Sequence, residues 1–235
     1  MENQVLYLVF LYNKNMDREI LSTFKSLKAL FNKNGFQLFF VGGTVRDYLL
    51  NLEIKDLDVV SDAKPEEMEL FLEDANYTFR KYGFVKLNYQ GYKFDITTLR
   101  KEEIYQDFRH PKVVVFCKTL QEDVKRRDFT INGLYMDDDL KIYDFINGEA
   151  DIKNKIIKTI GVADIRIKED PLRIYRAIRF MINLGFQLDE DLSLAIKNNA
   201  SLTHELNPQK IKEEIRKCLH PNKMIEILKG LDILC

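Results

Sequence analysis

The sequence predicts an α+β fold in which a small mixed or antiparallel sheet, flanked by helices, precedes an all-helical domain. Short apolar runs separated by turn residues fill the first part of the chain, and two of them, Phe84–Tyr89 and Tyr92–Thr98, read as a hairpin. From residue 166 to residue 228, apolar side chains recur almost only at helical spacing. We therefore expect two domains, residues 1–150 and residues 151–235.

The composition of the chain limits which classes of function are possible. The chain has 235 residues, of which 46% are hydrophobic and 31% charged, and its formal net charge is -1. A nucleic-acid partner would therefore have to be attracted by a local basic patch. Three scattered cysteines, Cys117, Cys218 and Cys235, argue against a disulfide framework or a zinc site and favour a reducing cytoplasm. No run is long enough to span a membrane, and the apolar stretch Val5–Leu11 lacks the flanks of a signal peptide.

The elements of the first domain follow from caps, turns and apolar runs. Asp17 is placed to cap a helix that stops at Gly35, and Pro65 begins another that should extend to about Asp74. Residues 100–120 carry mixed charges without periodicity, so we expect a mobile loop there. The predicted strands and hairpins are Gln37–Val41, Asp56–Val60, Phe84–Tyr89 joined to Tyr92–Thr98 at Gln90-Gly91, Val113–Phe116, and Tyr135–Phe145.

The stretch Phe40–Ser61 combines the features of a phosphate site and a metal site. Gly42 and Gly43 permit close backbone approach, and the short helix after them presents free N–H groups to an anion. In a strand, Asp56 and Asp58 would share one face, roughly 7 Å apart. Their charges repel unless a cation lies between them, and such oxygen ligands suit Mg²⁺ completed by substrate phosphates. The alternative is a turn followed by a solvated acidic strand.

Asp95 lies inside an otherwise apolar strand. A carboxylate in that position is costly unless it is paired or binds a metal. It therefore either joins Asp56 and Asp58 as a third carboxylate or is an edge residue that meets Lys93 or Arg100.

The segment from residue 122 to residue 132 concentrates polar groups beside apolar anchors. An arginine can hold phosphate oxygens in a fork, and an aspartate can accept a hydrogen bond from a ribose hydroxyl, so the adjacent Arg127 and Asp128 suit a sugar-phosphate. The alternative is a helix N-terminus with a surface ion pair.

The first helix of the second domain is expected to contain Glu169–Phe180. Its arginines share a face distinct from the apolar one, and Asp170 and Arg173, three residues apart, form a donor–acceptor pair able to meet the edge of a base. The simpler interpretation places Glu169 and Asp170 at a helix N-terminus, where their charges complement the dipole. Further helices are predicted near Asp189–Asn199, Pro208–Leu219 and Pro221–Leu234.

Four motifs now stand in one order: GGTVRDYLLN…KDLDVV, KFDITTLR, EDVKRRDFTIN and EDPLRIYRAIRF. Together they resemble the class II tRNA nucleotidyltransferases (CCA-adding enzymes) and bacterial poly(A) polymerases, a family within the DNA polymerase β-like superfamily. The resemblance covers roughly residues 35–219. It implies a catalytic head domain with a small mixed sheet, residues 1–150, and a helical neck that binds the nucleotide base, residues 151–235.

The resemblance also implies roles for individual residues. Asp56 and Asp58 would ligate two Mg²⁺ ions, with Asp95 as the third acidic group of the catalytic centre. The implied triphosphate positions are Gly42, Gly43 and Arg46. The implied positions for ribose selection are Arg127, Asp128 and Asn132. The implied positions for the base edge are Asp170 and Arg173, supported by Arg176 and Arg179. A turn that couples head and neck movements is implied at Asp144 and Gly148.

The implied reaction is attack of an RNA 3′-hydroxyl on the α-phosphate of CTP or ATP, with pyrophosphate leaving. The implied partner is the tRNA 3′ end, to which CCA or at least the terminal A is added. The alternatives are a poly(A) polymerase of the same family and a non-catalytic RNA-binding remnant.

Three departures from the family pattern and one agreement with it shape these expectations. Pro208–Ile211 replaces the usual Glu-Arg pair, and Gly148-Glu149 replaces a Gly-Gly pair. The loop after Leu99 has the full family length, which speaks against a CC-only enzyme. Family members usually continue with body and tail helices that hold the tRNA, whereas this sequence ends at Cys235. We therefore expect either a fragment or an unusually short enzyme that needs a partner chain or a second subunit to hold the RNA.

Overall fold

The computed structural model describes residues 16–102 and 114–233. The chain divides into two compact units, and each is described by itself. The first, called the sheet unit, consists of residues 16–101, 116–123 and 134–144. The second, called the helical unit, consists of residues 124–133 and 145–233 with residues 102 and 114–115.

A single cut at residue 150 does not follow these units, because residues 124–133 belong to the helical one. The ring of Phe129 packs edge-on against Phe180, with 5.9 Å between centroids, and the N–H of Thr130 donates to the carbonyl of Lys158. The functional division into head and neck stays a prediction.

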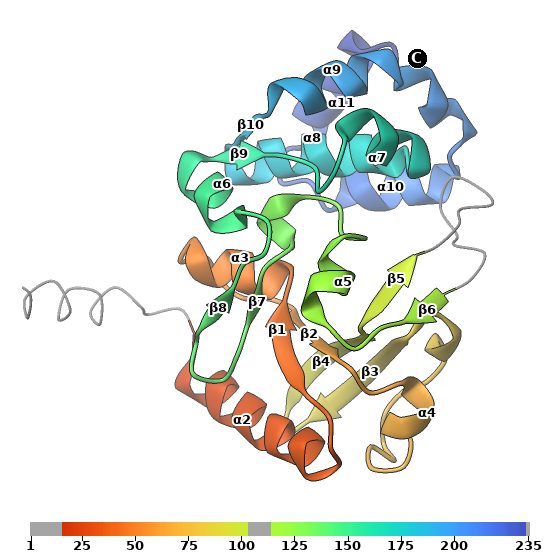
Figure 1. Cartoon of the computed structure of the whole chain (residues 1–235). Coiled ribbons are helices and arrows are strands. Elements are labelled where there is room, and N and C mark those ends of the chain that lie inside the picture. Colours follow the sequence, from red (N-terminus) through yellow and green to blue (C-terminus); the bar gives the residue numbers. More distant parts are fainter. Residues whose placement is uncertain (1–15, 103–113, 234–235) are drawn as a thin grey trace, which may run out of the picture. The chain divides into compact units, whose positions relative to one another are not determined.

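The sheet unit is built on a six-stranded mixed sheet in the order β3-β4-β2-β1-β7-β8 (Figure 1). The strands are β1 (Leu38–Val41), β2 (Leu57–Ser61), β3 (Phe84–Tyr89), β4 (Tyr92–Thr98), β7 (Tyr135–Met136) and β8 (Ile142–Tyr143). Strands β2 and β4 are parallel and the other neighbours antiparallel, so the mixed sheet predicted from the sequence is confirmed. Two further strands, β5 (Arg100–Glu102) and β6 (Val114–Phe116), pair separately.

The predicted hairpin between β3 and β4 is confirmed, and its turn explains the sequence. Gln90 and Gly91 have φ values of 49° and 85°, the left-handed conformation that a two-residue turn needs to match the strand twist.

The helices of the sheet unit are α2 (Arg18–Lys33), α3 (Gly43–Leu49), α4 (Pro65–Met68) and α5 (Leu120–Val124), with a 3₁₀ turn η1 (Arg80–Tyr82). The predicted cap holds, since the Asp17 carboxylate accepts from the Glu19 N–H. Helix α2 buries an apolar face against β1, where Phe24 stacks on Phe40 with 3.7 Å between ring centroids. This packing fixes the strand that leads into the glycine turn.

Helix α4 is shorter than the stretch to Asp74 that the sequence predicts. After Met68 the four-residue hydrogen-bond ladder is not continued regularly: Leu72 still donates to Met68, but Phe71 donates to Met68 and Ala75 to Leu72, each only three residues back. The segment therefore continues as turns instead of a helix.

The helical unit contains α6 (Gly148–Asn154), α7 (Ala163–Glu169), α8 (Leu172–Leu184), α9 (Glu190–Asn198), α10 (Pro208–Arg216) and α11 (Pro221–Gly230), with the 3₁₀ turns η2 (Thr130–Asn132) and η3 (Ala200–Glu205). Helix α8 is central: α7, α10 and α11 all contact it. A short parallel pair, β9 (Ile156–Ile157) and β10 (Gln187–Leu188), is not predicted by the sequence.

The single helix predicted over Glu169–Phe180 is wrong. Helix α7 ends at Glu169 and α8 begins at Leu172, with Asp170 extended at φ −147° and ψ 92°. A proline disfavours the helical conformation in the residue before it, so Pro171 breaks the helix at Asp170. Glu169 therefore ends a helix, and the dipole argument for it does not apply.

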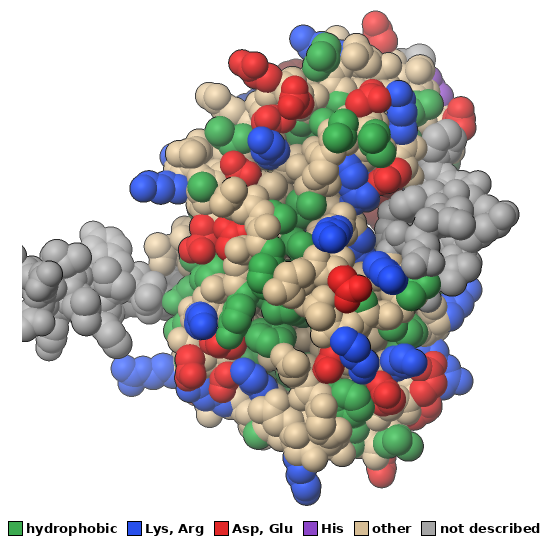
Figure 2. Space-filling model, viewed as in Figure 1, with side chains coloured by type: hydrophobic (Ala, Val, Ile, Leu, Met, Phe, Trp, Pro, Cys, Tyr) green, Lys and Arg blue, Asp and Glu red, His purple; other side chains and the backbone are tan. Residues whose placement is uncertain are grey.

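Acidic and basic side chains are interspersed over the face in Figure 2. Within the described residues no helix is both long and apolar enough to cross a membrane. Cys117 and Cys218 are buried. Three predictions lie outside the described residues: those for Val5–Leu11, Cys235 and most of the loop over residues 100–120.

Candidate active site

Asp58 and Asp95 lie next to each other in the sheet unit. They are register partners on the parallel strands β2 and β4, and each is partly exposed. Neighbouring strands are about 4.8 Å apart and partners share a face, so the two carboxylates flank one another. Strand β2 begins at Leu57, so the exposed Asp56 precedes the ladder and strand alternation does not orient it.

Asp95 has a cationic neighbour on its other side. Its register partner on β3 is Lys86, whose Nζ lies 3.3 Å from the Asp95 carboxylate. The sequence offers Lys93 or Arg100 as ion-pair partners, but the observed partner is Lys86. In the described part of the chain, no three His, Cys, Asp or Glu side chains are grouped as metal ligands. A metal ion bound by Asp58 and its neighbours would need further oxygen ligands from a bound substrate.

The glycine turn lies against the Asp58 carboxylate. Gly42 has φ 65° and ψ −124°, a conformation that side chains disfavour. A Cβ on Gly43 would stand 3.4 Å from Oδ2 of Asp58 and 3.7 Å from Nη2 of Arg46. Arg46 pairs with Asp47, with 2.7 Å from Nη2 to Oδ1. A Cβ at position 43 would thus be in van der Waals contact with the Asp58 carboxylate, which places the glycine turn directly beside it.

Thr44 connects the glycine turn to the acidic residues, although the sequence does not single it out. Its side chain is buried, its hydroxyl donates to the Asp56 carbonyl over 3.0 Å, and it accepts from the Asp58 N–H over 2.8 Å. Only the position of a threonine between a glycine pair and an acidic strand could have signalled this.

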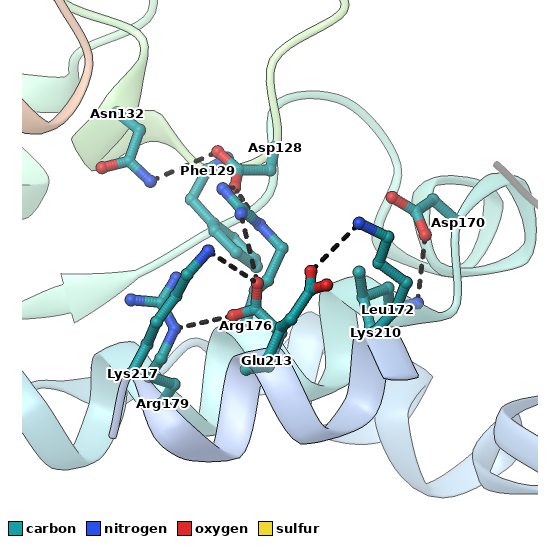
Figure 3. A network of polar contacts seen from close by, with 11 residues as sticks. Asp128, Phe129, Asn132, Asp170, Leu172, Arg176, Arg179, Lys210, Glu213 and Lys217 are labelled. Atoms are coloured by element: carbon teal, nitrogen blue, oxygen red, sulfur yellow. Dashed lines mark hydrogen bonds and ion pairs between the residues drawn. The ribbon is translucent and has the colours of Figure 1, made fainter. Parts of the chain in front are cut away.

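In the helical unit, Asp128 is the centre of a polar network (Figure 3). Arg176 donates from both Nε, over 2.8 Å, and Nη2 to Oδ2 of Asp128. The Phe129 N–H donates to Oδ1 over 2.7 Å, and the Asn132 amide does so over 3.3 Å. The Asp128 side chain is only 11% exposed. The structure thus brings together three residues that the sequence marks for the nucleotide: Asp128, Asn132 and Arg176.

Burial alone would raise the pKa of Asp128, but the charge and hydrogen bonds of Arg176, with the Phe129 N–H, hold it well below its usual range. Burial would lower the pKa of Arg176, and the nearby carboxylates of Asp128 and Glu214 raise it instead. Asp128 is therefore an ionised, oriented acceptor at neutral pH.

One buried carboxylate in this unit forms ion pairs with three cationic side chains. Glu214 on α10 lies 2.7 Å from Nε of Arg179, 3.8 Å from Arg176 and 3.9 Å from Lys217, and its side chain is 5% exposed. Burial lowers the pKa of Arg179 despite this partner. The sequence analysis does not name Glu214, although its place beside Ile211 and Ile215 on the apolar face of α10 is a usable signal.

Asp170 and Arg173 make different contacts. Oδ1 of Asp170 accepts from the Leu172 N–H over 3.1 Å, as in a helix cap. Arg173 is 5% exposed and lies 3.2 Å from Glu169, and it also donates to the Arg166 carbonyl over 2.5 Å. Their role toward a base stays a prediction.

Arg166 holds the backbone of the segment that leads to Asp128. It is buried, and its Nη2 donates to the carbonyls of Arg126, over 2.7 Å, and Arg127, over 2.9 Å. Asp144 follows β8 and Gly148 begins α6, so the predicted coupling turn lies where the chain passes from one unit to the other.

Comparison with known proteins independently supports the family resemblance seen in the sequence motifs. A family model described as the poly(A) polymerase head domain matches residues 38–158. The chain is 39% identical over 204 residues to a CCA-adding enzyme of Staphylococcus haemolyticus, covering 87% of this chain and 51% of that protein. It is 45% identical over 183 residues to one from Lactobacillus delbrueckii subsp. bulgaricus, covering 78% of this chain and 46% of that protein.

The fold is similar to that of the Bacillus stearothermophilus CCA-adding enzyme solved in complex with CTP. The TM-score is 0.78 at 34% identity, over 84% of this chain and 48% of that one. The chain thus spans about half the length of the relatives that it matches.

Proposed function

The chain belongs to the poly(A) polymerase head domain family, and from that premise we propose that it is a tRNA nucleotidyltransferase. It adds CCA, or the terminal A, to the 3′ end of tRNA from CTP and ATP. The relatives named as CCA-adding enzymes and the CTP complex of one of them support this choice of substrates.

The observation that carries the proposal is the position of Asp58, between the glycine turn and Asp95. A pair of carboxylates is the donor set that Mg²⁺ takes when substrate phosphates complete its coordination. The residues therefore fit a divalent ion, with Asp56 and Asp58 as its ligands and Asp95 as the third catalytic acid. The positions proposed to hold the triphosphate are Gly42, Gly43 and Arg46. When bound, the ion would favour ionisation of the attacking hydroxyl and neutralise charge on the leaving pyrophosphate.

The helical unit supplies recognition in this proposal. Asp128, kept ionised by Arg176, accepts a hydrogen bond from a ribose hydroxyl, which would replace its longest present bond, the 3.3 Å one from the Asn132 amide. Arg127 and Asn132 assist it. Asp170 and Arg173 read the base edge, and Arg176 and Arg179 support the nucleotide indirectly by orienting the carboxylates around it.

The RNA 3′-hydroxyl attacks the α-phosphate, a new phosphodiester bond forms, and the bond to pyrophosphate breaks. No nucleophilic side chain takes part in this proposal. The residues act by positioning and electrostatic stabilisation, which dominate catalysis of phosphoryl transfer.

The test is incorporation of labelled CTP or ATP, with Mg²⁺, into tRNA transcripts that end at the discriminator base, at C or at CC. Addition that stops at CCA supports the proposal. Long A tracts on unrelated RNA would identify a poly(A) polymerase instead. RNA binding without incorporation on any transcript would overturn the enzymatic function and leave a non-catalytic RNA-binding protein.

Replacing Asp58 by asparagine is expected to reduce incorporation by at least about a thousandfold, because it removes a charged ligand at the reacting centre. The measurement is the single-turnover rate on a tRNA ending in CC. Asp74→Asn, an exposed aspartate in the same unit, is the matched control and should keep the wild-type rate. Wild-type activity in Asp58→Asn, with the fold intact by circular dichroism, would refute the metal assignment.

A further inference from the structure

Thr44 joins the two halves of the acidic site in the sheet unit. Its hydroxyl donates to the carbonyl of Asp56 over 3.0 Å and accepts from the N–H of Asp58 over 2.8 Å. One hydroxyl has one donor hydrogen and two acceptor lone pairs, so both bonds form at once. The Thr44 side chain is thus hydrogen-bonded to the backbone of both residues whose carboxylates are the proposed metal ligands.

The surroundings make this bond pair hard to replace. Thr44 is 1% exposed, which keeps water from taking over the hydroxyl's bonds. It follows Gly43, whose backbone lies against the Asp58 carboxylate, and it belongs to the first turn of α3. Asp56 precedes β2, where no ladder bond of that strand fixes it. The Thr44 hydroxyl is therefore a specific tie between the glycine turn and Asp56.

We propose that Thr44 is a positioning residue that sets the spacing of the Asp56 and Asp58 carboxylates from each other and from the glycine turn. This inference rests on the proposed function, because it assumes that these carboxylates bind a divalent cation. Thr44 touches neither the cation nor the nucleotide. It acts through the backbone of the two aspartates, so its loss weakens metal binding without changing the choice between CTP and ATP.

The test measures Mn²⁺ binding to the whole chain without nucleotide, from the electron paramagnetic resonance signal of the free ion. Thr44→Val keeps the shape of the side chain and removes the hydroxyl. It is expected to weaken Mn²⁺ binding about tenfold, the lower end of the range for groups that orient metal ligands. Thr44→Ser keeps the hydroxyl and should stay within about threefold of the wild type.

Thr98→Val is the matched control. The Thr98 hydroxyl is also buried in the sheet unit and donates to the Ala63 carbonyl over 2.8 Å, but it does not contact the acidic residues. It should lower thermal stability while leaving Mn²⁺ affinity unchanged. In incorporation assays, Thr44→Val should raise the half-maximal Mg²⁺ concentration and keep the CTP-to-ATP preference.

Two outcomes distinguish a failure of the inference about Thr44 from a failure of the proposed function on which it rests. If Asp58→Asn abolishes Mn²⁺ binding but Thr44→Val binds as the wild type does, the inference about Thr44 is overturned and the metal site stands. If Asp58→Asn also binds Mn²⁺ normally, the metal assignment itself is overturned. Should Thr44→Val not fold, the same measurement on Thr44→Ala decides the question, with wild-type affinity counting against the inference.

Discussion

Asp128 carries its charge in a nearly buried position because Arg176 lies against it. Its pKa is lower in the folded chain than in the unfolded one, so its contribution to stability is complete above the ordinary aspartate pKa, near 3.9, and is lost as pH falls through the folded-state value. The wild-type free energy of unfolding should therefore fall more steeply below about pH 4 than that of Asp128→Asn.

Urea unfolding at a series of pH values measures this difference. At pH 7, Asp128→Asn should itself be about 3 kcal/mol less stable, because Arg176 loses its main counter-ion. Asp191→Asn, at an exposed position of the helical unit, should follow the wild-type curve. Parallel curves for the wild type and Asp128→Asn would contradict the assignment.

Arg173 offers a second residue-scale prediction. Lysine keeps the positive charge near Glu169 but loses the planar fork that the proposed base reading requires. Arg173→Lys should reduce discrimination between CTP and ATP about tenfold, roughly the value of one charge-assisted hydrogen bond, and change stability less than Arg173→Ala does. Nucleotide competition measures the ratio, with Arg216→Lys on the exposed side of α10 as control. Unchanged selectivity would refute the base-reading role.

The sequence indicates which acidic residues to consider but not all of their partners. Asp95 can be expected beside Asp58 because an acid inside an apolar strand needs a reason, and the register places it there. Lys86 could have been identified as its neighbour, because the two-residue turn at Gln90-Gly91 fixes the hairpin register and places residue 86 opposite residue 95, but the sequence analysis does not count back from the turn. Thr44 was not identifiable, since a hydroxyl bonded to two backbone groups leaves no periodic pattern.

At the scale of elements, Glu214 connects α10 to α8 through its ion pairs with Arg176 and Arg179. Glu214→Gln should lower the free energy of unfolding by about 3 kcal/mol, because it leaves Arg179 without its nearest carboxylate in a buried setting. Glu213→Gln is the matched control on the same helix. Glu213 pairs with Lys210 at 38% exposure, so its loss should cost less than about 1 kcal/mol. Equal losses in chemical denaturation would contradict this role for Glu214.

The elements that the sequence predicts well are those with a local cause. The β3–β4 hairpin follows from its turn residues, and α2 from its cap and apolar face. The break between α7 and α8 also has a local cause, Pro171, which the helical spacing around it conceals. By contrast, β9 and β10 pair residues some thirty positions apart over only two residues each, and so short a ladder has no period to detect.

At the scale of the whole molecule, the two units interleave along the chain. Residues 124–133 leave the sheet unit, pack among the helices, and are followed by β7 and β8, which return to the sheet. A sequence pattern marks where spacing changes, which is near residue 150, but it cannot show that an earlier segment has its packing partners beyond that point. The contact of Phe129 with Phe180 is such a partner.

The two described cysteines give a prediction for the whole chain. Cys117 lies in the sheet unit and Cys218 in the helical unit, and both are buried. In a Cys235→Ser variant, a thiol reagent should react with neither until the chain unfolds, and a reductant should leave the melting temperature unchanged. Rapid reaction of either thiol in the native protein would contradict their burial.

The carboxylate of Glu214, shared by Arg176, Arg179 and Lys217, also has a consequence for how this sequence can change over time. Substitutions at these positions do not act independently, because each alters the charge that the others face. Loss of one cation leaves Glu214 with two others, whereas loss of Glu214 leaves the largely buried Arg179 without its nearest carboxylate. The acidic position is therefore expected to tolerate substitution less readily than any one of the basic positions.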